Sequence, residues 1–163
     1  MPKPVPVADG PESYVPGNDG IIELEVGNPV MNKSTFGGHH AYPILGKDSN
    51  GDIECHRRYS HFDTFRSCLI KRYPGLYIPP IPTKVVQGKT DGMVTQERQY
   101  FLDLFLKKCC ELPYLARSNE MQLFLRPAGN DIEKPLNNVA KPTTGEALQV
   151  YRACVPVQEN WSE

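Results

Sequence analysis

The chain has 163 residues, a length that suits one domain with a hydrophobic core of its own. Its formal net charge is −1, so no overall field draws it to nucleic acid or to an acidic membrane, and any anion must be bound by a local cluster of cations. We therefore expect no nucleic-acid partner. Only 39% of the residues are hydrophobic and 16 are proline, which indicates that part of the chain is not packed. No apolar run is long enough for a transmembrane helix.

The N-terminal segment is expected to be a flexible tail. Residues 1–19 are rich in proline, glycine and acidic residues. The stretch from Met1 to Pro6 lacks the apolar core of a secretory signal, which favours a cytoplasmic protein. The five cysteines are an odd number without the spacing of a disulfide framework, and reduced thiols fit that compartment.

Three strands are expected next, joined by short turns into an antiparallel meander. Asn28-Pro29 marks a break or a bulge after the first strand, and Asn50-Gly51 is a strong hairpin signal between the second and the third. Pro43 favours an edge position for the second strand, because proline has no N–H to donate to a neighbour. The expected strands cover residues 21–26, 36–45 and 53–59.

The helical part follows the strands. Ser60 can cap the first helix, with Asp63 as the second residue of a short capping box, and Pro74-Gly75 ends it. A long proline-rich loop is expected over residues 74–94. Three helical faces are expected from the spacing of apolar residues: Phe62, Phe65, Leu69 and Tyr73; Leu102, Phe105, Leu106 and Cys109 within a helix over residues 95–112; and Met121, Phe124 and Leu125 within one over 118–125.

The chain after residue 126 is polar and shows weak periodicity. We expect residues 127–163 to be a polar tail or linker, in which residues 147–154 could form one isolated helix that is too short to be stable alone. The predicted organisation is therefore a tail over residues 1–19, a domain over residues 20–126 and a second tail over residues 127–163.

Four cations of the chain lie in three short motifs. Arg57 and Arg58 directly precede the first helix, Lys84 follows the prolines of the loop, and Arg98 lies near the expected start of the helix over residues 95–112. Strand alternation sends Arg57 and Arg58 to opposite faces, so only one of them serves a given pocket and Arg57 is expected to be structural. A cation in the first turn of a helix opposes the helix dipole, so Arg98 needs a bound anion or polyol to explain it. The motifs together predict a pocket for a phosphorylated headgroup.

The order of these motifs resembles a known family. Residues 57–62, residues 79–84, the pair Glu97-Arg98 and the ending over residues 112–125 are similar to a PX (phox-homology) domain of the sorting nexin type. The resemblance covers roughly residues 20–126. It implies an α+β fold, with a three-stranded antiparallel sheet packed on a helical subdomain. It also implies binding of phosphatidylinositol 3-phosphate, as a peripheral protein on endosomal membranes in membrane trafficking or protein sorting.

The same resemblance assigns roles to four residues. Arg58 would hold the 3-phosphate, and Tyr59 would pack its ring against the inositol. Lys84 would contact the 1-phosphate, and Arg98 would hydrogen-bond the inositol hydroxyls at positions 4 and 5. Each position carries the residue type that the family pattern asks for.

Four apolar residues of the expected loop have two interpretations. Val85, Val86, Met93 and Val94 could pack on their own domain, or they could insert into the interface of an anionic membrane. Each fully buried side chain would contribute about 1.5–3 kcal/mol, an upper figure for shallow insertion. Insertion would strengthen binding that a single headgroup makes weak.

A protein-interaction adaptor is the alternative function. The segment from Pro79 to Lys84 matches the P-x-x-P-x-basic pattern of an SH3 ligand, and protein partners could also bind the terminal tails. Cys55-His56 and Cys109-Cys110 lack the spacing of zinc ligands, and no catalytic motif is present, so we expect neither a metal, a cofactor nor an enzyme activity.

Overall fold

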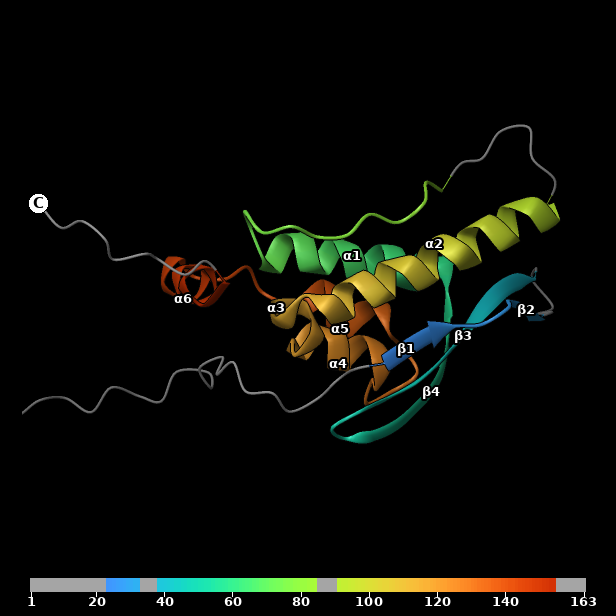
Figure 1. Ribbon diagram of the computed structural model, residues 1–163, viewed down its shortest axis with the longest axis horizontal. Coiled ribbons are helices and arrows are strands. Elements are labelled where there is room, and N and C mark those ends of the chain that lie inside the picture. Colours follow the sequence, from blue (N-terminus) through green and yellow to red (C-terminus); the bar gives the residue numbers. More distant parts are fainter. Residues whose placement is uncertain (1–22, 33–37, 85–90, 155–163) are drawn as a thin grey trace, which may run out of the picture.

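The computed structural model of the protein describes residues 23–32, 38–84 and 91–154, and the expected N-terminal tail and the pair Val85-Val86 lie outside them. An antiparallel sheet lies against a group of helices (Figure 1). The elements are β1 (Glu23–Val26), β2 (Val30–Asn32), β3 (His39–Asp48), β4 (Gly51–Arg58), α1 (Tyr59–Arg72), α2 (Asp91–Glu111), α3 (Pro113–Ala116), α4 (Asn119–Leu125), α5 (Glu133–Asn138) and α6 (Thr144–Cys154).

The strand β3 lies in the middle of the sheet. The strand β4 pairs with one side of it from Asp48↔Gly51 to Ala41↔Arg58. The strands β1 and β2 pair one after the other with its opposite side, β1 with Ile44 to Lys47 and β2 with His39 to Ala41. The predicted antiparallel meander is confirmed, with its first strand split in two at the break expected at Asn28-Pro29.

The expected edge position of Pro43 is wrong, because β3 is the central strand. The carbonyl of Pro43 accepts a hydrogen bond of 2.8 Å from the backbone N–H of Gly27. The N–H and C=O of a residue in an antiparallel ladder point to the same neighbour, so the donor that Pro43 lacks would also face this side. The gap between β1 and β2 lies there, and a bulge or break is where a sheet tolerates proline.

The hairpin between β3 and β4 is confirmed. Gly51 has a φ of +113°, in the region that favours glycine, and the Asp48 carboxylate accepts a hydrogen bond of 2.8 Å from the Asn50 backbone. Arg126, just after α4, donates to both oxygens of the same carboxylate. The tip of the hairpin is therefore tied to the helical part of the fold.

The core lies between the sheet and the helices, and it contains the apolar faces predicted for α1, α2 and α4. Phe65 stacks on Phe124 with ring centroids 4.3 Å apart, and Phe105 of α2 meets the rings of Phe62 and Phe65 edge-on. A fully buried phenylalanine contributes roughly 1.5–3 kcal/mol. The buried members of the predicted faces are Phe62, Phe65, Leu69, Leu102, Phe105, Leu106, Cys109, Met121, Phe124 and Leu125.

Two expected helix starts are wrong. The helix α1 begins at Tyr59, directly after β4, and the Ser60 hydroxyl donates to Glu133 of α5 instead of capping α1. The helix α2 begins at Asp91 rather than near Thr95, so Arg98 lies beyond its first turn. Contrary to expectation, Arg98 therefore does not oppose the helix dipole in the first turn of α2. The proline-rich loop also ends before Asp91, earlier than expected.

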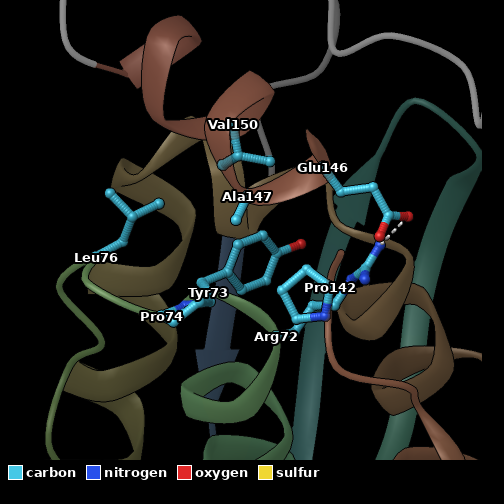
Figure 2. Close-up of a pocket in the computed structure, with 8 residues that line it drawn as sticks. All are labelled: Arg72, Tyr73, Pro74, Leu76, Pro142, Glu146, Ala147 and Val150. Carbon is cyan, nitrogen blue, oxygen red and sulfur yellow. Dashed lines mark hydrogen bonds and ion pairs between the residues drawn. The ribbon is translucent and has the colours of Figure 1, made fainter. Parts of the chain in front are cut away.

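Packing continues beyond the boundary expected at residue 126. The short helix α5 packs against α1 and α4, and Ile132 and Leu136 are buried in the core. The expected helix over residues 147–154 exists within α6, where no described side chain is fully buried. It touches the end of α1, where Arg72 approaches Glu146 at 3.5 Å (Figure 2). None of the helices in the described part of the chain is long and apolar enough to cross a membrane.

Candidate functional site

Arg57 and Arg58 point to opposite faces of β4, as alternation predicts. Arg57 is buried, and its guanidinium donates to the carbonyl of Phe124 at 2.7 Å and to that of Leu125 at 3.1 Å. These carbonyls belong to the last turn of α4, where the helix dipole favours a cation. The expectation that Arg57 is structural is confirmed.

Arg58 is exposed at the point where β4 passes into α1. Its Nε donates to Nε2 of His61 at 3.0 Å, and its Nη2 donates to the Glu133 carboxylate at 3.3 Å. Burial, with the Arg58 charge adding to it, lowers the pKa of His61 to about 4, so the imidazole is neutral and can accept this bond. One edge of the Arg58 guanidinium is thus fixed by a neutral partner, and another is held by an anion.

Tyr59 joins three elements around the site. Its hydroxyl donates to the carbonyl of Pro82 in the proline segment, and its ring lies 4.6 Å from Cζ of Arg98 on α2. Burial and the nearby Asp63 carboxylate raise the pKa of Tyr59, so the hydroxyl stays protonated and keeps donating. The ring and the cation attract each other by about 0.5–2 kcal/mol.

Arg98 has one free donor inside the fold. Its Nη2 donates to the carbonyl of Lys84 at 2.7 Å, whereas its Nε is buried and has no hydrogen-bond partner among the residues that the structure describes. A buried N–H without a partner is rare and costs about 1–3 kcal/mol. A cavity of about 280 Å³ adjoins this side chain, lined by Pro80, Ile81, Pro82, Thr83, Val94, Glu97, Arg98 and Phe101.

Lys84 follows the prolines and is held against α1. Its ammonium lies 2.6 Å from the Asp63 carboxylate, while its side chain remains 63% exposed. The hydrogen bond with Asp63 raises the pKa of Lys84, and Glu133 adds to this rise from α5. Glu133 therefore acts electrostatically on both Arg58 and Lys84.

The structure brings three of the predicted residues into direct contact. Tyr59, Lys84 and Arg98 are linked by the ring contact and by the bond to the Lys84 carbonyl, whereas Arg58 does not line the cavity beside Arg98. Arg58 adjoins the group as the chain neighbour of Tyr59, and Glu133 pairs with Arg58. Sequence reasoning missed Glu133 and His61, and the local signals for α5 were the i, i+4 spacing of Ile132 and Leu136 and the acceptor Asp131 before the helix.

Comparison with known proteins identifies the family of this chain. The sequence pattern of the PX domain family matches residues 46–128. The chain belongs to the PX domain family. A sorting nexin-41 from Yarrowia lipolytica is 34% identical over 86 residues, which cover 47% of this chain and 15% of that protein. The PX chain thus spans a small part of that relative.

Solved structures show the same fold. A designed CISK-PX domain matches with a TM-score of 0.57 and 24% identity, over 64% of this chain and 98% of that one. The mouse SNX19 PX domain with a bound sulphate ion matches with a TM-score of 0.51 and 23% identity, over 65% and 97%. The expected α+β fold is confirmed. PX domains bind phosphoinositides and membranes, and no enzyme family is indicated for this chain.

The apolar residues beside the PX pocket lie on a helix, not in a loop. Met93 and Val94 belong to the first turn of α2, with Met93 58% exposed and Val94 lining the cavity beside Arg98. Phe101 and Leu104 continue the exposed apolar surface along α2. Val85 and Val86 lie outside the described residues.

The SH3 interpretation of the proline segment is wrong, because the prolines are fixed in the PX fold. Pro79 is buried, and its carbonyl accepts a hydrogen bond of 2.8 Å from Nε of Arg66. The carbonyl of Pro82 accepts from Tyr59. An SH3 domain contacts both prolines of such a segment in an exposed polyproline II helix. The buried Pro79 is not available for that contact.

A second cavity, of about 70 Å³, lies between the end of α1 and α6. Figure 2 shows Arg72 and Glu146 on one side of it and Val150 on another. Arg72 lies 3.5 Å from the buried Glu120 and 3.5 Å from Glu146. Glu120 is buried and cannot turn toward solvent, so Arg72 stays paired, and we assign no headgroup to this cavity.

Proposed function

We propose that this PX domain binds phosphatidylinositol 3-phosphate and thereby recruits the protein to endosomal membranes for trafficking or sorting. Arg58 holds the 3-phosphate, and Tyr59 packs against the inositol ring. Lys84 contacts the 1-phosphate, and Arg98 donates to the 4- and 5-hydroxyls. The contacts of Tyr59, Lys84 and Arg98 with one another support a shared ligand.

The observation that carries the proposal is the buried Nε of Arg98. This donor faces no acceptor among the described residues, although Nη2 of the same guanidinium is bound to the Lys84 carbonyl. A hydroxyl or a phosphate oxygen of a ligand can accept a hydrogen bond from Nε. We assign the hydroxyl edge of the inositol to Arg98, because Arg58 and Lys84 are the cations assigned to the phosphates.

Membrane residence needs more than the headgroup. The net charge of −1 gives no general attraction to an anionic surface. Met93 precedes Val94, which lines the cavity beside Arg98, and is 58% exposed, so its side chain can enter the interface when the headgroup is bound. Val94 is proposed to contribute to the same insertion, together with Val85 and Val86.

The test is sedimentation with liposomes that each contain one phosphoinositide. The wild type is compared with Arg58→Ala, Arg98→Ala and, as a control, Arg152→Ala on α6, which removes an exposed arginine far from the site in sequence. We expect selective binding to phosphatidylinositol 3-phosphate that is lost in the first two variants and kept in the third. Equal, negligible binding of the wild type to every lipid would contradict the proposal and direct attention to protein partners of the tails.

A further inference from the structure

The carboxylate of Glu133 occupies a donor of Arg58, which the proposed ligand needs. Its Oε1 accepts a hydrogen bond of 2.8 Å from the Ser60 hydroxyl and lies 3.3 Å from Nη2 of Arg58. Ser60 and Arg58 flank Tyr59 at the start of α1, so Glu133 lies at the mouth of the site, although it is 75 residues away from Arg58 in the sequence.

The position of Glu133 is set by packing rather than by a free tail. Leu136, three residues later on α5, is fully buried, and Ile132 just before Glu133 is buried as well. The Lys134 backbone N–H donates to the Asp131 carboxylate at 3.0 Å, which fixes the start of α5. The backbone of α5 can therefore stay in place while the Glu133 side chain, which is 34% exposed, turns toward solvent.

Carboxylate and phosphate oxygens accept hydrogen bonds from the same donors. Glu133 receives a guanidinium N–H and a hydroxyl on one oxygen, as a phosphate oxygen would. The other expected phosphate ligand shows the same pattern, because the Lys84 ammonium is bound to the Asp63 carboxylate at 2.6 Å. The cations assigned to phosphates hold carboxylates, whereas Arg98, assigned to hydroxyls, keeps Nε open.

We propose that Glu133 is an internal competitor for the phosphate, which must leave Arg58 and Ser60 before the headgroup can bind. This inference rests on the proposed function and concerns the regulation of the same site. An exposed ion pair of this kind contributes little to stability, so a phosphate that makes several bonds can displace the carboxylate. The competitor raises the apparent Kd for the lipid, so a higher density of the lipid in the membrane is needed to fill the site.

The inference is tested with soluble inositol 1,3-bisphosphate in calorimetry and with vesicles that contain phosphatidylinositol 3-phosphate. Glu133→Gln removes the charge and keeps the shape, and Glu133→Asp keeps the charge on a shorter side chain. The matched control is Glu111→Gln, because Glu111 also pairs with a cation but lies at the far end of α2. We expect Glu133→Gln to bind both probes about two- to fivefold more tightly than the wild type, Glu133→Asp to fall between them and Glu111→Gln to be unchanged.

Each outcome decides one question. Binding by the wild type with equal or weaker binding by Glu133→Gln would overturn the inference and leave the proposed function standing, with Glu133 a merely structural contact. Absence of binding by the wild type and by Glu133→Gln would overturn both. Weak binding by the wild type and clear binding by Glu133→Gln would support both, and thermal unfolding of each variant shows whether the change in affinity is separate from any change in stability.

Discussion

The arginines of this PX domain fall into two regions that use the same side chain in opposite ways. At the seam between the sheet and α4, Arg57 and Arg126 donate to backbone carbonyls and to the nearly buried carboxylate of Asp48. At the mouth of the site, Arg58 is bound to side chains that can turn away, and Arg98 keeps one donor without a partner among the described residues.

The difference shows what distinguishes a structural cation from a binding one. A carbonyl at the end of a helix cannot leave without breaking the fold, so Arg57 has no donors to offer a ligand. A carboxylate on a half-exposed side chain can be exchanged for a phosphate at little cost. Two adjacent arginines in one strand therefore have separate roles. Substitutions in the two regions should have different effects on stability and on binding.

The largest effect on stability is expected from replacing Arg57, with the replacement of its neighbour Arg58 as the comparison. Arg57→Met should destabilise the fold by about 3–5 kcal/mol, because it leaves the Phe124 and Leu125 carbonyls without their buried donor. Arg58→Met should change the free energy of unfolding by less than about 1 kcal/mol. Urea denaturation followed by circular dichroism measures both values, and similar losses in the two variants would contradict the division into two regions.

The stability that the pair of Arg126 and Asp48 contributes should depend on pH. The hydrogen bonds from Arg126 hold the pKa of Asp48 below its usual value. A carboxylate with a lowered folded pKa contributes stability above its unfolded value, near pH 4, and loses it as the pH falls through the folded pKa. Asp48→Asn should cost about 1.5–3 kcal/mol at pH 7, since the bonds involve a charged group.

Thermal or urea unfolding of the wild type and Asp48→Asn from pH 7 to pH 2 provides the test. The difference in stability between them should shrink as the pH falls below about 4. A difference that stays constant across this range would show that the charge of Asp48 is not what holds the hairpin.

In the binding region, a loss of lipid affinity is expected from a substitution of Arg98. Arg98→Lys keeps the positive charge but loses the planar fork and the donor at Nε. We expect binding to phosphatidylinositol 3-phosphate to weaken by about tenfold, corresponding to one hydrogen bond to a charged group, with stability changed by no more than about 1 kcal/mol. Unaltered affinity would mean that the buried Nε of Arg98 does not face the ligand.

The smallest effect is expected at the membrane surface. Met93→Ser should weaken binding to vesicles by up to a few fold, because shallow insertion recovers only part of the value of full burial. Binding to soluble inositol 1,3-bisphosphate should not change. A matched loss with both probes would show that Met93 supports the pocket rather than the bilayer contact.

Local patterns predicted most of the fold. The strand alternation, the Asn50-Gly51 hairpin and the apolar faces of α1, α2 and α4 depend on residues close in the chain, and the structure confirms them. The start of α2 and the place of Pro43 within the central strand were missed. Gly92, a poor helix former, lies in the first turn of α2, and the tolerance of Pro43 depends on a gap in the strand opposite.

The residues of the candidate site were likewise predicted only in part from the sequence. Arg58, Tyr59, Lys84 and Arg98 lie in motifs that the sequence displays, and their roles as ligands of the headgroup stay predictions. Glu133 could not be foreseen, because its contacts with Arg58 and Ser60 join residues more than 70 positions apart. Polar composition after residue 126 concealed a helix whose burial depends on only Ile132 and Leu136.

The burial of Leu136 has a practical consequence for anyone who shortens this protein. A chain cut after residue 128, where the family match ends, would keep all four predicted headgroup ligands but lose α5. It would expose apolar surface on α1 and α4 and would also remove Glu133 from Arg58. Such a truncation should be more prone to aggregation and, if Glu133 competes with phosphate, should overstate the affinity of the longer chain. Expression boundaries are better placed beyond Val139, which packs against the same core.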